Sequence, residues 1–319
     1  MSIIEQATKR LEELTRSGVV VPWVAAGLSK SELQEQVESV RRAAAAALTP
    51  AAAMRRLERD LVSVPEPVLR PARPASGAEP PAAVTLDLER LGRSGLLVPT
   101  QARSAQAEEF RQIKRPLLKN ARSKEAAANR LSLIMVTSAL PGEGKTFCGI
   151  NLAMSMATEI DMSVLLVDAD VIRPEVLQRL GIEAEKGLLD LLTDPNLSLS
   201  EVVLKTNIPK LSILPSGRRT NLSTELLASE AMEALLISLA NSHQDCVVIF
   251  DAPPLLVTSE AKVLASRVGQ VVLVVEASKT QRSTVAQAFA AVEQCPIVMS
   301  VLNKAHEHSG PHDYGYYYG

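Results

Sequence analysis

Residues 133–146 read Leu-Ile-Met-Val-Thr-Ser-Ala-Leu-Pro-Gly-Glu-Gly-Lys-Thr, an apolar run followed at once by a glycine-rich turn. The apolar run, 133–138, predicts a buried strand, and the residues after Lys145 and Thr146 predict a helix. Small glycines let consecutive backbone N–H groups close around phosphate oxygens, and the start of a helix adds positive potential. Ala139 stands where the strict pattern has its first glycine, so an ordinary tight turn is the alternative. The order strand, loop, helix favours a phosphate-binding loop.

Two further apolar runs end in carboxylates. One run reaches Asp168 and Asp170, and the other, at 246–251, ends at Asp251. Because the carboxyl ends of parallel strands meet at one edge of an open sheet, we expect these acids to lie near the glycine loop. One carboxylate would hold Mg²⁺, and another would orient or deprotonate an attacking oxygen. Helix capping is the alternative for a single aspartate at a strand end.

The segments around these motifs alternate between short β-branched runs and helical patterns. This alternation predicts an α/β fold of the P-loop NTPase type, with a doubly wound, mostly parallel sheet covered by helices on both faces. A basic helical segment at 104–122 precedes the sheet, and Pro116 is expected to kink or interrupt it. The strands are expected at 131–137, 163–168, 211–214, 246–251, 271–276 and 297–302.

The chain divides into a body and flanking segments of different composition. Residues 62–84 are rich in Pro, Ala, Ser and Gly, which bury too little apolar surface to fold, so this segment is expected to be a partly disordered linker. The predicted organisation is a helical N-terminal region at 1–61, the linker at 62–84, a short helix with an extended connector at 85–103, the domain with the glycine loop at 104–303 and a flexible tail at 304–319.

The composition of the 319 residues argues against several classes of protein. A net charge of −2 gives no reason to expect nucleic acid as a partner. No apolar run is long enough to cross a membrane, and the first residues lack the features of a signal peptide. The three cysteines are odd in number and far apart, which predicts reduced thiols. We therefore expect a soluble cytoplasmic protein.

All four tyrosines lie within the last six residues of the chain. A buried core normally recruits tyrosine for its large ring, whereas here each phenol sits in a glycine-flanked tail. An aromatic tail used for docking is one interpretation. Together with a phosphate-binding loop, the placement favours tyrosines that receive phosphate. The predicted acceptors are Tyr314, Tyr316, Tyr317 and Tyr318.

These motifs resemble those of the bacterial tyrosine kinases (BY-kinases). The three nucleotide motifs of that family correspond to 138–146, 165–170 and 250–254 in this sequence. The resemblance covers about residues 105–319 and includes the terminal tyrosine cluster. The short N-terminal part resembles the exosortase-associated branch, whose tyrosine autokinases serve exopolysaccharide production. Further matching blocks lie at 211–217, at Asn221 with 226–229, and at 301–303.

The resemblance implies an ATP-dependent protein-tyrosine kinase and assigns roles to the loop and the strand ends. Asp168 would activate the tyrosine hydroxyl, and Asn303 would contact adenine. The implied catalytic residues are Lys145, Asp168, Asp170 and Asp251; the implied ATP-binding residues are Pro141, Gly142, Glu143, Gly144, Lys145, Thr146, Phe147 and Asn303; and the implied Mg²⁺ ligands, direct or through water, are Thr146, Asp168 and Asp251.

The resemblance also implies assembly. Glu108, Arg111 and Lys114 fall on the Glu-x-x-Arg-x-x-Arg helix that joins subunits of this family into rings. Lysine replaces the final arginine here, which puts a bidentate contact at that position in doubt. The tail of one subunit would enter the ATP site of its neighbour. The implied partners are other copies of the chain, a tyrosine phosphatase, and a membrane-embedded polysaccharide chain-length regulator that activates the kinase at the inner face of the membrane.

Two other functions are compatible with the expected fold. One is an ATPase switch of the partition or division-site type, but such proteins usually carry an extra lysine where this chain has Leu140. The other is an ATP-binding scaffold that controls polysaccharide chain length through a membrane partner without essential kinase activity. Intact Lys145, Asp168 and Asp251 favour catalysis over a scaffold. Formation of phosphotyrosine from ATP by the purified protein discriminates these functions.

Overall fold

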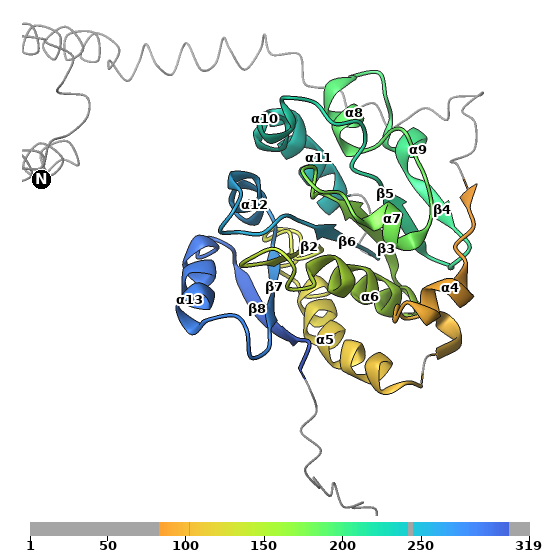
Figure 1. Cartoon of the computed structure of the whole chain (residues 1–319). Coiled ribbons are helices and arrows are strands. Elements are labelled where there is room, and N and C mark those ends of the chain that lie inside the picture. The colour runs from red at the N-terminus through yellow and green to blue at the C-terminus, as the bar shows by residue number, and fades with distance from the viewer. Residues whose placement is uncertain (1–82, 102, 242–244, 306–319) are drawn as a thin grey trace, which may run out of the picture. The chain divides into compact units, whose positions relative to one another are not determined.

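The computed structural model describes residues 83–305, with gaps at 102 and 242–244 (Figure 1). The helices expected before residue 62, most of the expected linker and the four tail tyrosines lie outside the described residues. In the part of the chain that is described, no helix has both the length and the apolar character needed to cross a membrane.

One eight-stranded sheet forms the centre of the described chain, with the strand order β1-β4-β5-β3-β6-β2-β7-β8. All neighbouring strands are parallel except β4 and β5, which are antiparallel. The six apolar runs predicted as strands are strands, which confirms the predicted fold class; β1 and β4 were not predicted. The strands are β1 (Ala83–Val84), β2 (Leu133–Ser138), β3 (Ser163–Asp168), β4 (Leu204–Thr206), β5 (Leu211–Leu214), β6 (Cys246–Asp251), β7 (Gln270–Glu276) and β8 (Ile297–Asn303).

Helices cover both faces of this sheet (Figure 1). Successive residues of a strand point to opposite faces, so in β2 Ile134 and Val136 belong to one buried cluster while Leu133 and Met135 belong to the other. Burial on both faces explains why the central strands read as continuous apolar runs. The helices are α4 (Leu88–Arg93), η2 (Pro99–Gln101), α5 (Ala105–Ala121), α6 (Lys145–Ala157), α7 (Val176–Leu180), α8 (Leu188–Thr193), α9 (Leu199–Val202), α10 (Ser223–Ala228), α11 (Glu230–Asn241), α12 (Ser259–Ala265) and α13 (Arg282–Ala291).

The domain begins about twenty residues earlier than the sequence indicated. β1 pairs with β4 at one edge of the sheet, although its two residues had been assigned to the linker. Leu86 is tied to the sheet because its backbone N–H donates to Asn207 Oδ1 at 2.9 Å and its carbonyl accepts from Asn207 Nδ2 at 3.1 Å. Leu91 and Leu97 lie in the same buried cluster as β2 and α6. The predicted boundary at residue 104 therefore falls inside the folded unit.

Helix α5 continues through Pro116, so the expected interruption is wrong. Pro116 lies on the exposed side of the helix, while Phe110, Leu117 and Leu118 are buried on the other side. The apolar face thus packs on the domain both before and after the proline. This packing outweighs the one backbone hydrogen bond that a proline removes from a helix.

Candidate active site

The glycine loop connects β2 to α6 and leaves the start of α6 open. Gly142 and Gly144 have φ angles of 86° and 100°, in the left-handed region that favours glycine. Gly144 is also the N-cap of α6, and no side chain caps the helix there. The first backbone N–H groups of a helix have no partner within it, so this end is built to receive an anion. The backbone of Ala139 does not have a positive φ angle, so this position does not require glycine.

The carboxylate of Glu143 holds the loop together from within. Glu143 is buried, and its Oε2 accepts a hydrogen bond from the backbone N–H of Leu140 at 2.7 Å. The hydroxyl of Thr280, in the segment after β7, donates to Oε1 of the same carboxylate. The side chain of Glu143 is therefore occupied by the protein, and only its backbone N–H is available for a phosphate.

The acids at the strand ends meet the loop, as their positions predicted. Asp168 and Asp251 end the neighbouring strands β3 and β6 and lie directly opposite each other in the ladder. The Nζ of Lys145 is 2.7 Å from Oδ2 of Asp170 and 3.9 Å from Oδ1 of Asp251. It also lies 3.3 Å from the hydroxyl oxygen of Thr146. The structure thus brings all four predicted catalytic residues and Thr146 to one edge of the sheet.

Burial shapes the electrostatics of this group. It raises the pKa of Asp251 to about 6, against the opposing charge of Lys145. Burial, followed by the negative charge of Asp251, raises the pKa of Asp168 well above its ordinary value. Burial works against the charge on Lys145, but the carboxylates of Asp251 and Asp170 outweigh it and raise the pKa of Lys145. The site therefore contains more negative charge than Lys145 balances.

The unpartnered oxygens in the site fit a divalent cation. Oδ1 of Asp168 and both carboxylate oxygens of Asp251 are buried without a hydrogen-bond partner among the described residues. Buried carboxylates without partners are costly, and oxygen ligands of this kind suit Mg²⁺. The described residues contain no cluster of three or more His, Cys, Asp or Glu that could hold a metal alone. A cation here would need the Thr146 hydroxyl, water or a phosphate to complete its coordination.

Two hollows open near the site, and they share no lining residue. The first reaches Asp168 and is bordered by α7 and by the loop after β5, with Leu177, Ile182 and Ser216 in its lining. The second lies between α5, the start of α6 and the end of β8. Phe147 and Asn303, both predicted to bind ATP, line this second hollow. Pro141 is exposed on the loop.

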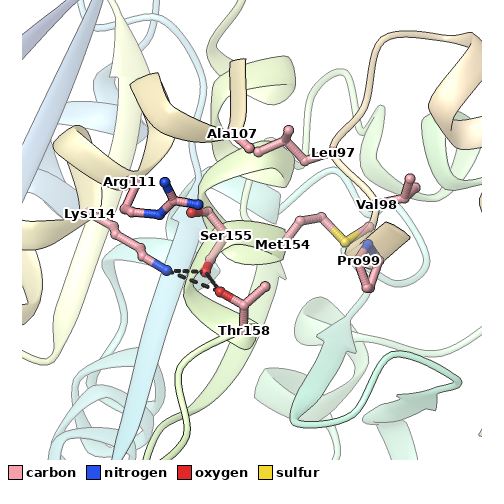
Figure 2. Close-up of a pocket in the computed structure, with 9 residues that line it drawn as sticks. All are labelled: Leu97, Val98, Pro99, Ala107, Arg111, Lys114, Met154, Ser155 and Thr158. Atoms are coloured by element: carbon pink, nitrogen blue, oxygen red, sulfur yellow. Dashed lines mark hydrogen bonds between the residues drawn. The ribbon is translucent and has the colours of Figure 1, made fainter. Parts of the chain in front are cut away.

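The three predicted subunit-contact residues lie on α5, and one of them, Lys114, is buried against its own chain. Lys114 is buried, and its Nζ donates to the carbonyl of Ser155 at 2.6 Å and to the hydroxyl of Thr158 at 3.1 Å (Figure 2). It also pairs with Glu159 at 2.7 Å. Lys114 therefore ties α5 to the end of α6, and its role as a subunit contact stays a prediction. Arg111 pairs with Glu108 on the partly exposed side of α5.

A small cavity lies beside this contact, between α5, α6 and the segment after α4 (Figure 2). Its side chains come from two neighbouring segments, 97–99 and 107–114, and from 154–158, about forty residues later, so no local pattern predicted it. Its lining residues are Leu97, Val98, Pro99, Ala107, Arg111, Lys114, Met154, Ser155 and Thr158.

Sequence reasoning missed the residues that hold the loop from outside. Lys304 donates to the carbonyl of Gly142 at 2.7 Å, and Asn303 Nδ2 donates to the carbonyl of Glu143 at 2.8 Å. The sequence predicts an adenine contact for Asn303 and no role for Lys304 or Thr280. No local pattern could have found them, because more than 130 residues separate each of them from the loop.

Comparison with known proteins identifies the family. A family model described as an AAA domain matches residues 132–302, more than half of the chain. The tyrosine-protein kinase YwqD of Bacillus subtilis (strain 168) is 32% identical over 223 residues, a match that covers 68% of this chain and 89% of YwqD. EpsB of Ralstonia solanacearum is also 32% identical, over 59% of this chain, but the chain covers only 24% of that longer protein.

A solved structure agrees with this relationship. The kinase domain of VpsO is 30% identical, with a TM-score of 0.50, and the match covers 64% of this chain and 100% of that domain. Together with the glycine loop, the two acidic strand ends and the parallel sheet, these similarities show that the chain belongs to the bacterial tyrosine kinase (BY-kinase) family.

Proposed function

We propose that this chain is an ATP-dependent autokinase that phosphorylates its own C-terminal tyrosines, one subunit acting on the tail of another. One observation carries the proposal: Lys145, Asp168, Asp170 and Asp251 gather at the uncapped start of α6. That arrangement combines a site for the phosphates with a carboxylate whose oxygen has no hydrogen-bond partner and can accept a proton. Phosphoryl transfer needs both.

The nucleotide would bind on the loop and on the hollow next to it. The backbone N–H groups of residues 142–146 and the ammonium of Lys145 would hold the phosphates. Phe147 and Asn303 would border the adenine, since both line the hollow between α5 and β8. Mg²⁺, held by the hydroxyl of Thr146 and by Asp251, with Asp168 adjacent, would neutralise charge on the phosphates.

The phenol would approach through the hollow that opens onto Asp168. Its oxygen would form a bond to the γ-phosphorus as the bond to the bridging oxygen of ADP breaks, and its proton would pass to Oδ1 of Asp168. That oxygen has no hydrogen-bond partner in the described chain, whereas Oδ2 accepts from the backbone N–H of Val176 at 3.2 Å. The raised pKa of Asp168 makes it a stronger base than an exposed aspartate.

The acceptors of the proposal are Tyr314, Tyr316, Tyr317 and Tyr318. Residues 304–318 could span roughly 50 Å when extended, enough to reach a neighbouring copy. Each phosphotyrosine would add about −1.5 to −2 charges, so a fully modified tail would repel other tails and oppose assembly. Glu108 and Arg111 on α5 would contribute to the contact between copies, in a homo-oligomer that could close into a ring.

The cellular setting that we propose follows the family. The kinase would act in the cytoplasm at the inner face of the cell membrane, recruited and activated by a membrane-embedded regulator of polysaccharide chain length. A tyrosine phosphatase would reset the tail. The output would be control of exopolysaccharide synthesis or export.

A mixing experiment tests the autokinase and the direction of transfer together. Lys145→Met keeps the tail but loses the phosphate-binding lysine, and a variant with all four tyrosines changed to Phe keeps the site but loses the acceptors. Neither should form phosphotyrosine alone with ATP and Mg²⁺. Mixed, they should place phosphate on the tail of the Lys145→Met chain, as read by mass spectrometry.

Other outcomes of this experiment identify other functions. If the wild type forms phosphotyrosine but the mixture of Lys145→Met and four-Phe chains does not, the transfer occurs within one chain. Phosphate on serine or threonine of the Lys145→Met chain in the mixture, with none on its four tyrosines, would remove the acceptor assignment. ATP hydrolysis by the wild type without phosphotyrosine would favour the switch ATPase, and nucleotide binding with neither reaction would favour the scaffold.

A further inference from the structure

The last residue of β8 and the residue after it hydrogen-bond to the backbone of the phosphate-binding loop. Two consecutive carbonyls of the loop, those of Gly142 and Glu143, accept hydrogen bonds from Lys304 Nζ at 2.7 Å and from Asn303 Nδ2 at 2.8 Å. A backbone N–H of Ala277 donates in turn to the carbonyl of Asn303 at 2.8 Å, which fixes the end of β8 to the segment after β7. The loop is thus held from a part of the chain 160 residues away.

These two hydrogen bonds set the direction of two loop amides. In a planar trans peptide the C=O and the N–H point in opposite directions, and the described residues contain no cis peptide bond. A donor that holds the carbonyl of Gly142 outward therefore turns the N–H of Glu143 inward. Asn303 does the same for the N–H of Gly144 through the carbonyl of Glu143. Both N–H groups are among those expected to bind phosphate.

Lys304 is itself held in an unusual backbone conformation. Its φ angle of 57° lies in the left-handed region, which is costly for a residue with a side chain and is found mainly where the surroundings enforce it. Its ammonium pairs with Glu276 Oε1 at 3.3 Å, at the end of β7. The backbone N–H of Glu276 donates to the hydroxyl of Thr280, which binds Glu143. Lys304 thus belongs to a closed network around the loop.

We propose that Lys304 is a positioning residue of the nucleotide site, which orients the loop amides toward the phosphates by holding the carbonyl of Gly142. Its ammonium acts through the outward-facing carbonyl of Gly142, and the residue also lines the hollow proposed for the adenine. This role rests on the proposed binding of ATP at the loop. Because Lys304 is also the first residue of the predicted acceptor tail, the tail begins at a residue that shapes the site.

Lys279 provides a matched control. Its Nζ pairs with Glu276 at 3.2 Å, as that of Lys304 does, but among the described residues Lys279 makes no hydrogen bond to the loop. The two lysines therefore share a partner and a charge, and they differ in the contact with Gly142. Their side chains are 46% exposed for Lys304 and 74% for Lys279, so neither substitution opens the core.

The test compares Lys304→Met and Lys279→Met in the full-length chain. Calorimetry with Mg²⁺-ADP should show about tenfold weaker binding for Lys304→Met, the effect of losing one hydrogen bond from a charged donor, and a change of less than about twofold for Lys279→Met. For the kinase reaction, Lys304→Met should raise KM for ATP more than it lowers kcat. Equal thermal unfolding temperatures would exclude a loss of folding as the cause.

Two results would overturn the inference. ADP affinity within about twofold of wild type in Lys304→Met would remove the positioning role. An equal loss in both variants would assign the effect to charge near Glu276. The failure of the proposed function is distinct: a wild-type chain that binds no ADP would end both proposals, while ADP binding that depends on Lys304 without phosphotyrosine formation would end only the autokinase.

Discussion

Lys145 is paired with Asp170 rather than with Asp251: its Nζ lies 2.7 Å from Oδ2 of Asp170 and 3.9 Å from Oδ1 of Asp251. Asp170 has a second partner, since its Oδ1 accepts from the backbone N–H of Arg173 at 2.9 Å. Asp251, apart from the more distant Lys145, has no hydrogen-bond partner in the described chain. The two carboxylates beside one lysine thus differ in what they contribute to the fold.

Asp251→Asn should stabilise the protein at neutral pH while it abolishes catalysis. The pKa of Asp251 is raised from its ordinary 3.8 to about 6, so ionisation of this carboxylate destabilises the folded state progressively as the pH rises from 3.8 to about 6. The gain at pH 8 should reach at most about 3 kcal/mol in the free energy of unfolding, and it should shrink as the pH falls through 6. Urea denaturation at pH 5.5 and pH 8, without nucleotide or Mg²⁺, measures both.

Asp170→Asn is the matched control, with the opposite expected sign. It removes the near partner of a buried lysine, so it should destabilise the fold by about 1–3 kcal/mol at pH 8. Equal losses of stability in Asp170→Asn and Asp251→Asn would contradict the assignment of Asp170 as the partner of Lys145.

Changing Gly144 to Ala should disable the loop, whereas giving residue 139 the glycine of the strict pattern should not improve it. An alanine at 144 would have to adopt a φ of 100°, and its Cβ would clash with Asn303 Nδ2. The expected result is loss of measurable ADP binding and a destabilisation of about 1–2 kcal/mol. Ala139→Gly should leave ADP affinity unchanged and cost about 0.5–1 kcal/mol, because Ala139 is buried and its backbone needs no glycine. Tighter ADP binding in Ala139→Gly would show that the missing glycine matters.

Lys114→Ala should lower the free energy of unfolding of the domain without a direct effect on phosphoryl transfer. The change leaves the carbonyl of Ser155 and the carboxylate of Glu159 without the ammonium that bridges them, at an expected cost of about 2–4 kcal/mol. Glu108→Gln, on the same helix, should change the free energy of unfolding by less than about 1 kcal/mol, because its pair with Arg111 is partly exposed. Chemical denaturation of both variants checks this.

The same two variants separate folding from assembly. If Glu108 contributes to a subunit contact, Glu108→Gln should lower the oligomeric mass seen in light scattering at unchanged stability. A stable Lys114→Ala chain with a reduced mass would instead assign Lys114 to the contact between copies.

The region before α5 should behave as part of the core. Leu91 is fully buried in α4, so Leu91→Ala should cost about 2–5 kcal/mol in the free energy of unfolding. Glu89→Ala, on the exposed side of the same helix, should cost less than about 1 kcal/mol. A chain that lacks residues 1–82 should fold, and one that lacks 1–103 should lose β1 and the buried leucines that follow. Circular dichroism melts would contradict this if the shorter chain were equally stable.

The sheet and the catalytic edge were predictable because their determinants are local. Runs such as 246–251 are apolar throughout and end in an aspartate, and parallel strands bring such ends together. The loop was recognisable from Gly142, Gly144 and Lys145 even without the first glycine of the strict pattern.

The remaining features depend on contacts between distant segments. The helix predicted at 104–122 is rich in basic residues. Nothing in its sequence pattern distinguishes Lys114, whose side chain is buried, from Arg115, whose side chain is exposed. β1 is two residues long and lies at the end of a segment whose composition is typical of linkers, so only its pairing with β4 identifies it as a strand. Lys304 follows the last strand by one position, and its contact with Gly142 joins two segments that are 162 residues apart.

The strand order also separates the two ends of the domain. β1 lies at one edge of the sheet and β8 at the other, and six strands stand between them. At about 4.8 Å per strand, the point where the N-terminal segment enters and the point where the tyrosine tail departs are on the order of 30 Å apart. Residues 83 and 305 therefore belong to opposite edges of the sheet, and a partner that contacts one of these edges does not thereby cover the other.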